Sequence, residues 1–200
     1  MPDNTIVTVL GMKGSGKTTL VKEMVSDWDR VVIVDANGEY EDGTIAWGLE
    51  ESVNALQRYE NAQRFTLSLR LERKEDSLKI LRLTYLLSDV LVVIDEASLY
   101  SSAAFMPDEI GRLVRFGRHK QISLFFVARR ASEIPRDITA NSDIVVSFRQ
   151  QEPRDKEYLM SLFGEKAEKV DRLPQYQVMV FGNIEKAPLA LIERMDSDTG

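Results

Sequence analysis

The octapeptide Gly-Met-Lys-Gly-Ser-Gly-Lys-Thr at residues 11–18 constrains this chain more than any other feature. It matches the pattern G-x-x-x-x-G-K-[ST], which is that of a phosphate-binding loop. An apolar, β-branched run at residues 6–10 precedes it, and residues 19–25 can begin a helix. A glycine-rich turn between a buried strand and a helix points successive N–H groups at an anion, and the helix dipole adds partial positive charge. The sequence therefore predicts a binding site for a nucleoside triphosphate.

The parts of this loop have separate expected roles. Lys17 is expected to reach the β- and γ-phosphates, and Thr18 is expected to hold Mg²⁺ through its hydroxyl. ATP with Mg²⁺ is the expected ligand, although no base-specific motif distinguishes ATP from GTP. The residues expected to bind the nucleotide are Gly11, Lys13, Gly14, Ser15, Gly16, Lys17, Thr18 and Thr19.

The length and composition indicate a single domain. The chain has 200 residues, of which 44% are hydrophobic and 29% charged, enough for one core and a well-solvated surface. We expect one ATPase domain over residues 1–195 and a frayed tail at 196–200. No apolar run approaches the ~20 residues that a membrane span needs, so no span is expected. The absence of cysteine excludes disulfides and thiolate metal sites, and the single histidine, His119, excludes a histidine triad or a multi-histidine metal site.

Apolar strand-like runs alternate with helical patterns along the chain. This alternation predicts an α/β fold with a central, mainly parallel sheet flanked by helices on both faces. Residues 177–181 and 189–192 are expected to close the fold as a C-terminal β-hairpin around Gly182-Asn183. The strands are expected at residues 6–10, 30–35, 64–70, 90–94, 122–127 and 144–148, and the helices directly after the phosphate loop and at 51–62, 74–88, 108–120 and 154–163.

The most apolar of the expected strands, residues 90–94, ends at Asp95-Glu96. An acid at the carboxyl end of a strand lies at the edge where open α/β sheets bind ligands. Asp95 is expected in the Mg²⁺ shell, in contact through water, and Glu96 is expected to polarise the attacking water. Asp35, at the tip of the second expected strand, and Glu39, shortly after it, are candidates for placing water or Mg²⁺, or for capping their own loop. An acid beside the metal aspartate favours an ATPase that does mechanical work over a small-molecule kinase.

Three segments resemble the HerA–FtsK superfamily of DNA-pumping ATPases. Residues 35–40, Asp-Ala-Asn-Gly-Glu-Tyr, look like the HerA-type Asp-Pro-x-Gly-Glu-Tyr. Residues 134–141, Ile-Pro-Arg-Asp-Ile-Thr-Ala-Asn, look like the family's Ile-Pro-x-x-Ile-x-x-Asn, and residues 173–182 resemble its closing strand. The resemblance covers nearly the whole chain and implies a RecA-like P-loop NTPase fold. It also implies a homo-oligomeric ring, a pentamer or hexamer, with ATP between subunits and double-stranded DNA as the molecule that is moved.

One position departs from this family. Where the family has a sensor glutamine, this chain has Arg129. Glutamine can orient a water and contact the γ-phosphate as a neutral donor, whereas arginine carries permanent charge and reaches further. Three interpretations of Arg129 are open: contact with the γ-phosphate, contact with a neighbouring subunit, or pairing with an acid.

A basic cluster lies in the helix expected at residues 108–120. Arg115 and Arg118 are the candidates for an arginine finger that acts on the ATP of the next subunit. Contact with DNA phosphates, or a solvated helix face that pairs with local acids, are the alternatives. Because the net charge is −6, any contact with DNA must be confined to a local surface of this kind. The members of the cluster are Arg112, Arg115, Arg118, His119 and Lys120.

These features favour an ATP-driven translocase of double-stranded DNA. A core of this size, without spans or extra domains, looks like the genome-packaging ATPases of tailless, internal-membrane double-stranded DNA viruses, which package DNA into a preformed capsid. A capsid or membrane vertex protein would then be a further partner, and the expected location is the cytoplasm, that of the host for a viral protein, or the virion vertex. A cellular or plasmid translocase remains open, as does a nucleotide switch that pumps nothing, since partition-type switch ATPases also place a lysine, here Lys13, early in their loop.

Overall fold

The computed structural model describes residues 4–197, whose strands form one eight-stranded sheet in the order β3-β4-β2-β5-β6-β1-β7-β8. Every neighbouring pair of strands is parallel except β7 and β8, which are antiparallel. The central strands are nearly continuous apolar runs, as expected for parallel strands that are buried on both faces. The strands are β1 (Ile6–Leu10), β2 (Arg30–Val34), β3 (Thr44–Trp47), β4 (Phe65–Arg70), β5 (Val90–Ile94), β6 (Ile122–Ala128), β7 (Ile144–Ser147) and β8 (Met179–Gly182).

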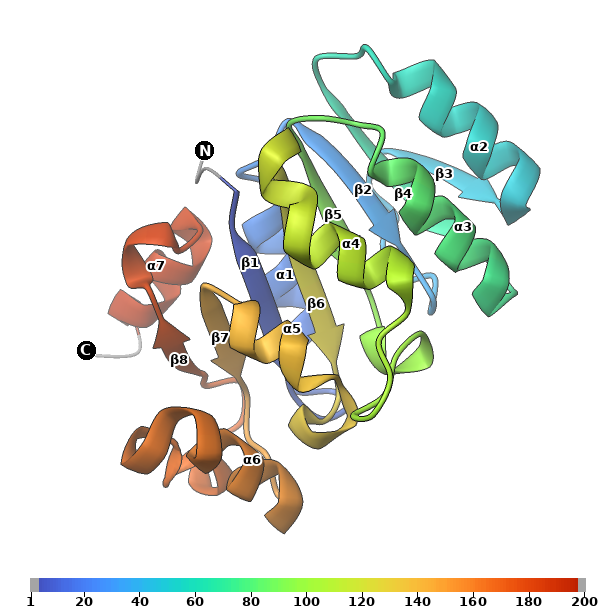
Figure 1. Ribbon diagram of the computed structural model, residues 1–200. Coiled ribbons are helices and arrows are strands. Elements are labelled where there is room, and N and C mark those ends of the chain that lie inside the picture. The colour runs from blue at the N-terminus through green and yellow to red at the C-terminus, as the bar shows by residue number, and fades with distance from the viewer. Residues whose placement is uncertain (1–3, 198–200) are drawn as a thin grey trace.

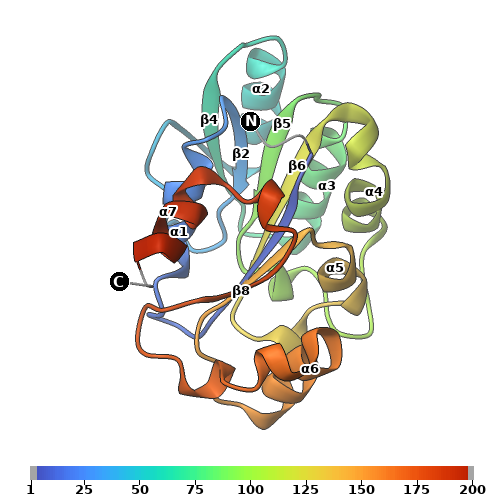
Figure 2. The same ribbon diagram turned by 90° about the vertical axis from the view of Figure 1, so that its left-hand side faces the viewer.

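Helices cover both faces of this sheet, so the fold has three layers (Figures 1 and 2). One face carries α1 (Lys17–Val25) and α7 (Leu189–Ser197), and α6 (Pro153–Phe163) lies beyond the carboxyl end of β7. The opposite face carries α2 (Gly48–Tyr59), α3 (Lys74–Thr84), α4 (Asp108–Phe116) and α5 (Arg136–Asn141). Among the described residues, no helix has both the length and the apolar character needed to cross a membrane.

Two hydrophobic cores form between these layers, one on each face of the sheet. On the α1 side, Leu20 and Met24 are buried against Val7 and Phe125. On the other side lies a cluster that includes Ile80, Leu81, Ile110, Leu113 and Ile138, packed against the opposite face of the same strands. The alternation of faces along each strand divides its side chains between the two cores.

The expected fold class is confirmed, because the sheet is central, mainly parallel and flanked by helices. Two elements were not expected from the sequence. Strand β3 pairs with β4 at the sheet edge, in a stretch where the sequence predicted neither strand nor helix, and the short helix α5 follows Pro135. Edge strands and six-residue helices leave weak periodic patterns because few of their positions are buried.

The expected C-terminal hairpin was wrong. Strand β8 pairs instead with β7, and Ile144 lies opposite Gly182. Residues 189–192 begin helix α7, in which Leu191 is fully buried while Leu189 is 66% exposed. A short apolar run can be read as a strand or a helix, and here packing against α1 selects the helix. Of the expected frayed tail, residues 196 and 197 belong to α7, and 198–200 lie outside the described residues.

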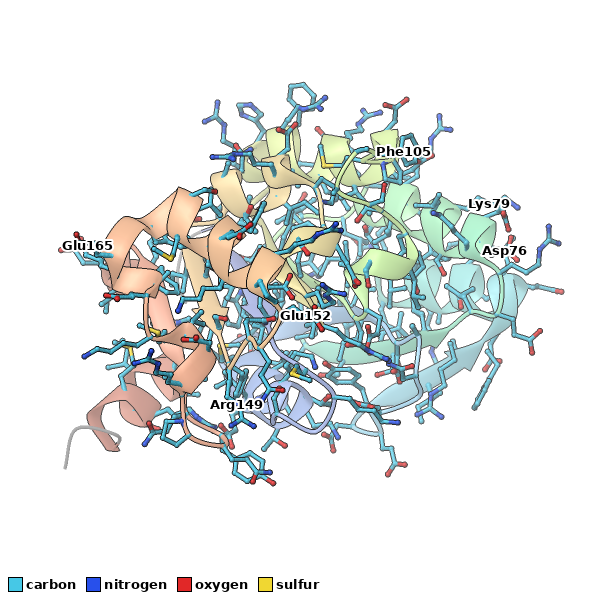
Figure 3. All side chains as sticks on the ribbon, turned by 90° about the horizontal axis from the view of Figure 1, so that it is seen from below. Asp76, Lys79, Phe105, Arg149, Glu152 and Glu165 are labelled. Atoms are coloured by element: carbon cyan, nitrogen blue, oxygen red, sulfur yellow. The ribbon has the colours of Figure 1, made fainter. Side chains whose placement is uncertain are left out.

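The strand register brings several strand ends to one edge of the sheet. Leu10 at the end of β1 lies beside Ala128 at the end of β6, and Val34 at the end of β2 lies beside Ile94 at the end of β5. Figure 1 shows this edge at the bottom of the molecule, and Figure 3 views the molecule from that side. The loops that follow these four strands therefore meet at one place, as is usual for ligand sites in open α/β sheets.

Candidate active site

The phosphate loop joins β1 to α1 in a tight turn. The amide of Gly11 donates to Ala128 O at 3.1 Å, and the amide of Ser15 donates to Met12 O at 3.2 Å. Gly14 and Gly16 have φ angles of 75° and 100°, a left-handed conformation that side-chain-bearing residues rarely adopt. A Cβ on Gly11 would lie 2.5 Å from Ser15 Oγ and 2.8 Å from Phe148 Cβ. The glycines are therefore required by the shape of the turn.

Lys17, the first residue of α1, points back over this loop. Its ammonium donates to Met12 O at 3.2 Å, and the residue is only 8% exposed. Burial lowers the pKa of Lys17 below its usual value, although the nearby Glu96 and Asp95 carboxylates oppose this shift. A bound phosphate would add negative charge beside the ammonium and so offset the cost of burying it.

The acid pair Asp95-Glu96 follows β5 and faces the same space. Asp95 is 3% exposed and Glu96 is 8% exposed. Burial and, after it, the negative charges of Glu96, Glu39 and Asp35 together raise the pKa of Asp95 to about 7. Glu96 has φ 49° and ψ 53°, so the chain turns sharply directly after the strand. Such crowding of carboxylates in a buried cleft is typical of a functional site.

A cavity of about 490 Å³ connects the phosphate loop with the acid pair. The structure thereby brings together most of the residues expected to bind nucleotide and metal. Gly11 and Ser15 are not part of its wall; Gly11 is buried, and Ser15 faces a second cavity of about 220 Å³. The residues that line the larger cavity are Lys13, Gly14, Gly16, Lys17, Thr18, Thr19, Asn37, Glu39, Asp95, Glu96, Arg129 and Tyr176.

The loop after β2 supplies a third wall. Asp35 accepts hydrogen bonds from the amides of Glu39 (2.9 Å) and Tyr40 (3.1 Å), and from Arg70 Nε (3.3 Å). Its carboxylate therefore caps its own loop. This cap holds Glu39 where it accepts a hydrogen bond from the hydroxyl of Thr18. Of the two acids considered from the sequence, Glu39 faces the cavity and Asp35 organises the loop behind it.

Sequence reasoning missed two residues of the cavity. Asn37 directs Nδ2 toward Asp95 Oδ2 at 3.4 Å and Glu96 Oε1 at 3.5 Å. Its place in the loop after β2, whose strand neighbours β5, is a signal that could have found it. Tyr176 is 55% exposed, has φ 67°, and lies against Gly16 from a loop before β8. No sequence pattern marks that contact, because the two loops are brought together only by the fold.

Arg129 follows β6 and completes the cavity on the side of the acid pair. Its Nε donates to Glu96 Oε1 at 2.8 Å. The hydrogen bond and charge of Glu96 raise the pKa of Arg129. Of the three interpretations open at the sequence level, pairing with an acid is the one visible in this structure. The acid is Glu96, the residue expected to act on water.

Arg115 and Arg118 lie elsewhere. Both are exposed, and with Asn4 and Ile6 they line a cavity of about 410 Å³ at the start of β1. The phosphate loop follows the opposite end of that five-residue strand, so roughly 16 Å of strand separates the two edges. These arginines therefore do not contribute to the phosphate cavity of their own chain.

Comparison with known proteins identifies the family of this chain and structures that share its fold. The family model described as AAA domain matches residues 2–134. No curated protein sequence matches the chain. Among solved structures, the genome packaging NTPase B204 from Sulfolobus turreted icosahedral virus 2, in complex with ATP-gammaS, is similar with a TM-score of 0.74 and 21% identity, covering 94% of this chain and 96% of that one.

Two further structures have the same fold. The DNA-packaging ATPase B204 from Sulfolobus turreted icosahedral virus has a TM-score of 0.69 at 20% identity, over 94% of this chain and 96% of that chain. VirB4 of Thermoanaerobacter pseudethanolicus has a TM-score of 0.63 at 11% identity, over 94% and 91% of the two chains. The resemblance expected from the sequence is thus confirmed at the level of the fold. With a family match over more than half of its length and a phosphate cavity built from the expected loop, the chain belongs to the AAA domain family of P-loop ATPases.

Proposed function

We propose that this protein is an ATP-driven translocase of double-stranded DNA that packages a viral genome into a preformed capsid. The observation that carries the proposal is the cavity in which the phosphate loop faces a buried acid pair. Support for packaging comes from the full-length likeness to B204, which is described as a genome packaging NTPase. The conjugation coupling protein TcpA of pCW3 is matched over 65% of its chain with a TM-score of 0.53, so a conjugative role has weaker support.

The proposed chemistry is hydrolysis of the γ-phosphate. The amides of the phosphate loop and the ammonium of Lys17 hold the β- and γ-phosphates. Glu96 polarises a water whose oxygen attacks the γ-phosphorus, and its carboxylate accepts the proton from that water. The bond from the γ-phosphorus to the bridging oxygen breaks, and ADP leaves with that oxygen. Charge on the phosphoryl oxygens is stabilised by Lys17 and by the other donors of the cavity.

The donors in the cavity fit a magnesium ion. Among the described side chains, no three carboxylates or histidines are grouped closely enough to hold a metal by themselves. Thr18 and Asp95 offer hard oxygen ligands, and phosphate oxygens and water would supply the others. The raised pKa of Asp95 reflects crowding among carboxylates that a cation would relieve. When bound, Mg²⁺ would neutralise charge on the phosphates.

The positions of Arg115 and Arg118 support action outside their own nucleotide site. Both lie on an exposed basic surface at the opposite edge of the sheet, formed by α4 and the turn that follows it. In a ring, this surface would meet either the ATP of a neighbouring subunit or the DNA backbone. The two alternatives predict different ATPase activities for rings that combine variant and wild-type subunits. Under either alternative, DNA or a second copy of the chain lies against α4.

The rate of ATP hydrolysis with and without double-stranded DNA tests the proposal, together with the native mass of the protein. A motor is expected to hydrolyse ATP several-fold faster on DNA, as a closed oligomer. A rate that does not respond to DNA, in a protein that remains monomeric at assay concentrations, would favour a nucleotide switch instead. Lys17→Ala serves as the control for hydrolysis by a contaminating enzyme.

A further inference from the structure

The ion pair between Arg129 and Glu96 has a consequence for the hydrolytic cycle. Glu96 Oε1 accepts from Arg129 Nε at 2.8 Å, and Asn37 Nδ2 lies 3.5 Å from the same oxygen. This carboxylate is the group that the proposed function assigns to the attacking water. An oxygen that already accepts a charged hydrogen bond is a poorer acceptor for water, because the guanidinium draws electron density from it.

The backbone around Arg129 is anchored, whereas its side chain has room to move. The carbonyl of Arg129 accepts from Gln150 Nε2 at 3.4 Å, and Gln150 is buried. The next residue, Arg130, pairs with the buried Asp155 at 3.1 Å, and Asp155 also accepts from the amide of Ser132 at 2.9 Å. The side chain of Arg129 is nevertheless 49% exposed, on the wall of the phosphate cavity. A fixed main chain with a half-exposed side chain allows the guanidinium to change partners without movement of the strand.

A triphosphate in the cavity would compete with Glu96 for this guanidinium. The γ-phosphate carries more negative charge than one carboxylate, and its oxygens match the planar donor fork of arginine. Lys17 lines the same cavity as the acid pair, so phosphates bound to its ammonium would lie on the side of Asp95 and Glu96. ADP lacks the γ-phosphate and would leave the ion pair intact.

We infer that Arg129 alternates between two partners, Glu96 in the nucleotide-free protein and the γ-phosphate in the ATP-bound protein. Its transfer to phosphate frees Glu96 to polarise water only when a cleavable phosphate is present. This inference rests on the proposed function of the site. It assigns to Arg129 a task that a sensor glutamine could not perform in this way, since glutamine has no charge with which to hold a carboxylate.

A double-mutant cycle on nucleotide affinity tests the exchange. Binding of ATPγS must break the Arg129–Glu96 pair, so Glu96→Gln, which weakens the pair, is expected to tighten ATPγS binding by roughly two- to fivefold. ADP affinity is expected to stay the same. In an Arg129→Ala background, Glu96→Gln is expected to bring no gain. Affinities are measured by isothermal titration for wild type, both single variants and the double variant.

Two results would overturn the inference: an equal gain for ADP and ATPγS, or a gain that persists without Arg129. Arg129→Gln is a second variant that keeps polar hydrogen bonding, and it is expected to behave like Arg129→Ala in the cycle. Lys79→Ala is the matched control, because it breaks an exposed ion pair with Asp76 on α3, at the far flank of the molecule in Figure 3. If wild type failed to bind ATPγS at all, the proposed nucleotide site itself would be wrong. If wild type binds ATPγS, Lys17→Ala abolishes that binding, and the double-mutant cycle shows no coupling between Glu96 and Arg129, only the exchange by Arg129 would be wrong.

Discussion

Asn37 Nδ2 lies 3.4 Å from Asp95 Oδ2 and so joins the loop after β2 to the acid pair after β5. Asn37 is a neutral donor beside the two carboxylates of the acid pair. Asn37→Asp would add a further negative charge beside Asp95, whose pKa the neighbouring acids already raise. We expect Asn37→Asp to lower kcat more than Asn37→Ala does, by about tenfold against a few-fold. Steady-state kinetics of the two variants in parallel checks this, and equal losses would show that the charge at this position has no effect.

Glu96→Gln is expected to separate binding from cleavage. The amide keeps the shape of the side chain but cannot accept a proton from water, so kcat should fall by at least ~100-fold. ATP binding should remain, because the phosphate loop and Lys17 are unchanged. Hydrolysis is followed by release of inorganic phosphate under single-turnover conditions. Hydrolysis at the wild-type rate would remove Glu96 from the proposed chemistry.

The pKa of Asp95 predicts a pH-dependent stability in the absence of metal and nucleotide. Its value of about 7 in the folded protein lies above its ordinary value of 3.8, so the folded state holds the proton more tightly than the unfolded chain does. Stability from this group is therefore fully present below pH 3.8 and is lost as the pH rises through 7. Asp95→Asn removes the titration and should stabilise the protein by roughly 1–4 kcal/mol at pH 8.5, and by less at pH 4.5. Thermal unfolding at the two pH values measures the difference; the same gain at both would contradict the assigned pKa.

Arg115→Ala and Arg118→Ala are expected to leave the affinity of the isolated subunit for ATP unchanged, because both residues lie at the edge of the sheet away from their own phosphate loop. If either acts on a neighbouring subunit, variant subunits mixed with wild type should lower ATPase activity more than in proportion to their fraction. The measurement is a titration of variant into wild type at constant total protein. A loss in strict proportion would argue against action between subunits and leave DNA contact as the role of this surface.

The sequence was informative where local chemistry determines structure. The glycines of the phosphate loop and the apolar run of β5 ending at Asp95 predict both walls of the cavity, because a tight turn and a buried parallel strand each demand particular residue types. These elements also predict the fold class, since alternating strands and helices have few ways to pack.

Contacts between distant segments could not be read in the same way. Tyr176 reaches the phosphate loop from a loop whose sequence has no periodic pattern. The pairing of Arg129 with Glu96 depends on β5 and β6 being neighbours in register. The chain end was misread for the same reason, because Leu191 takes its helical form from packing against α1 and the sheet. Sequence reasoning is weakest where tertiary packing decides between two local structures.

The central claim is that the loop at residues 11–18 and the acids after β5 form one nucleotide site, and titration of ATPγS with Mg²⁺ tests it most directly. Wild type and Glu96→Gln are expected to bind with saturation at one nucleotide per chain, and Lys17→Ala is expected to bind at least ~100-fold more weakly. Equal affinity in Lys17→Ala and wild type would contradict the account, because the nucleotide would then bind somewhere other than this cavity.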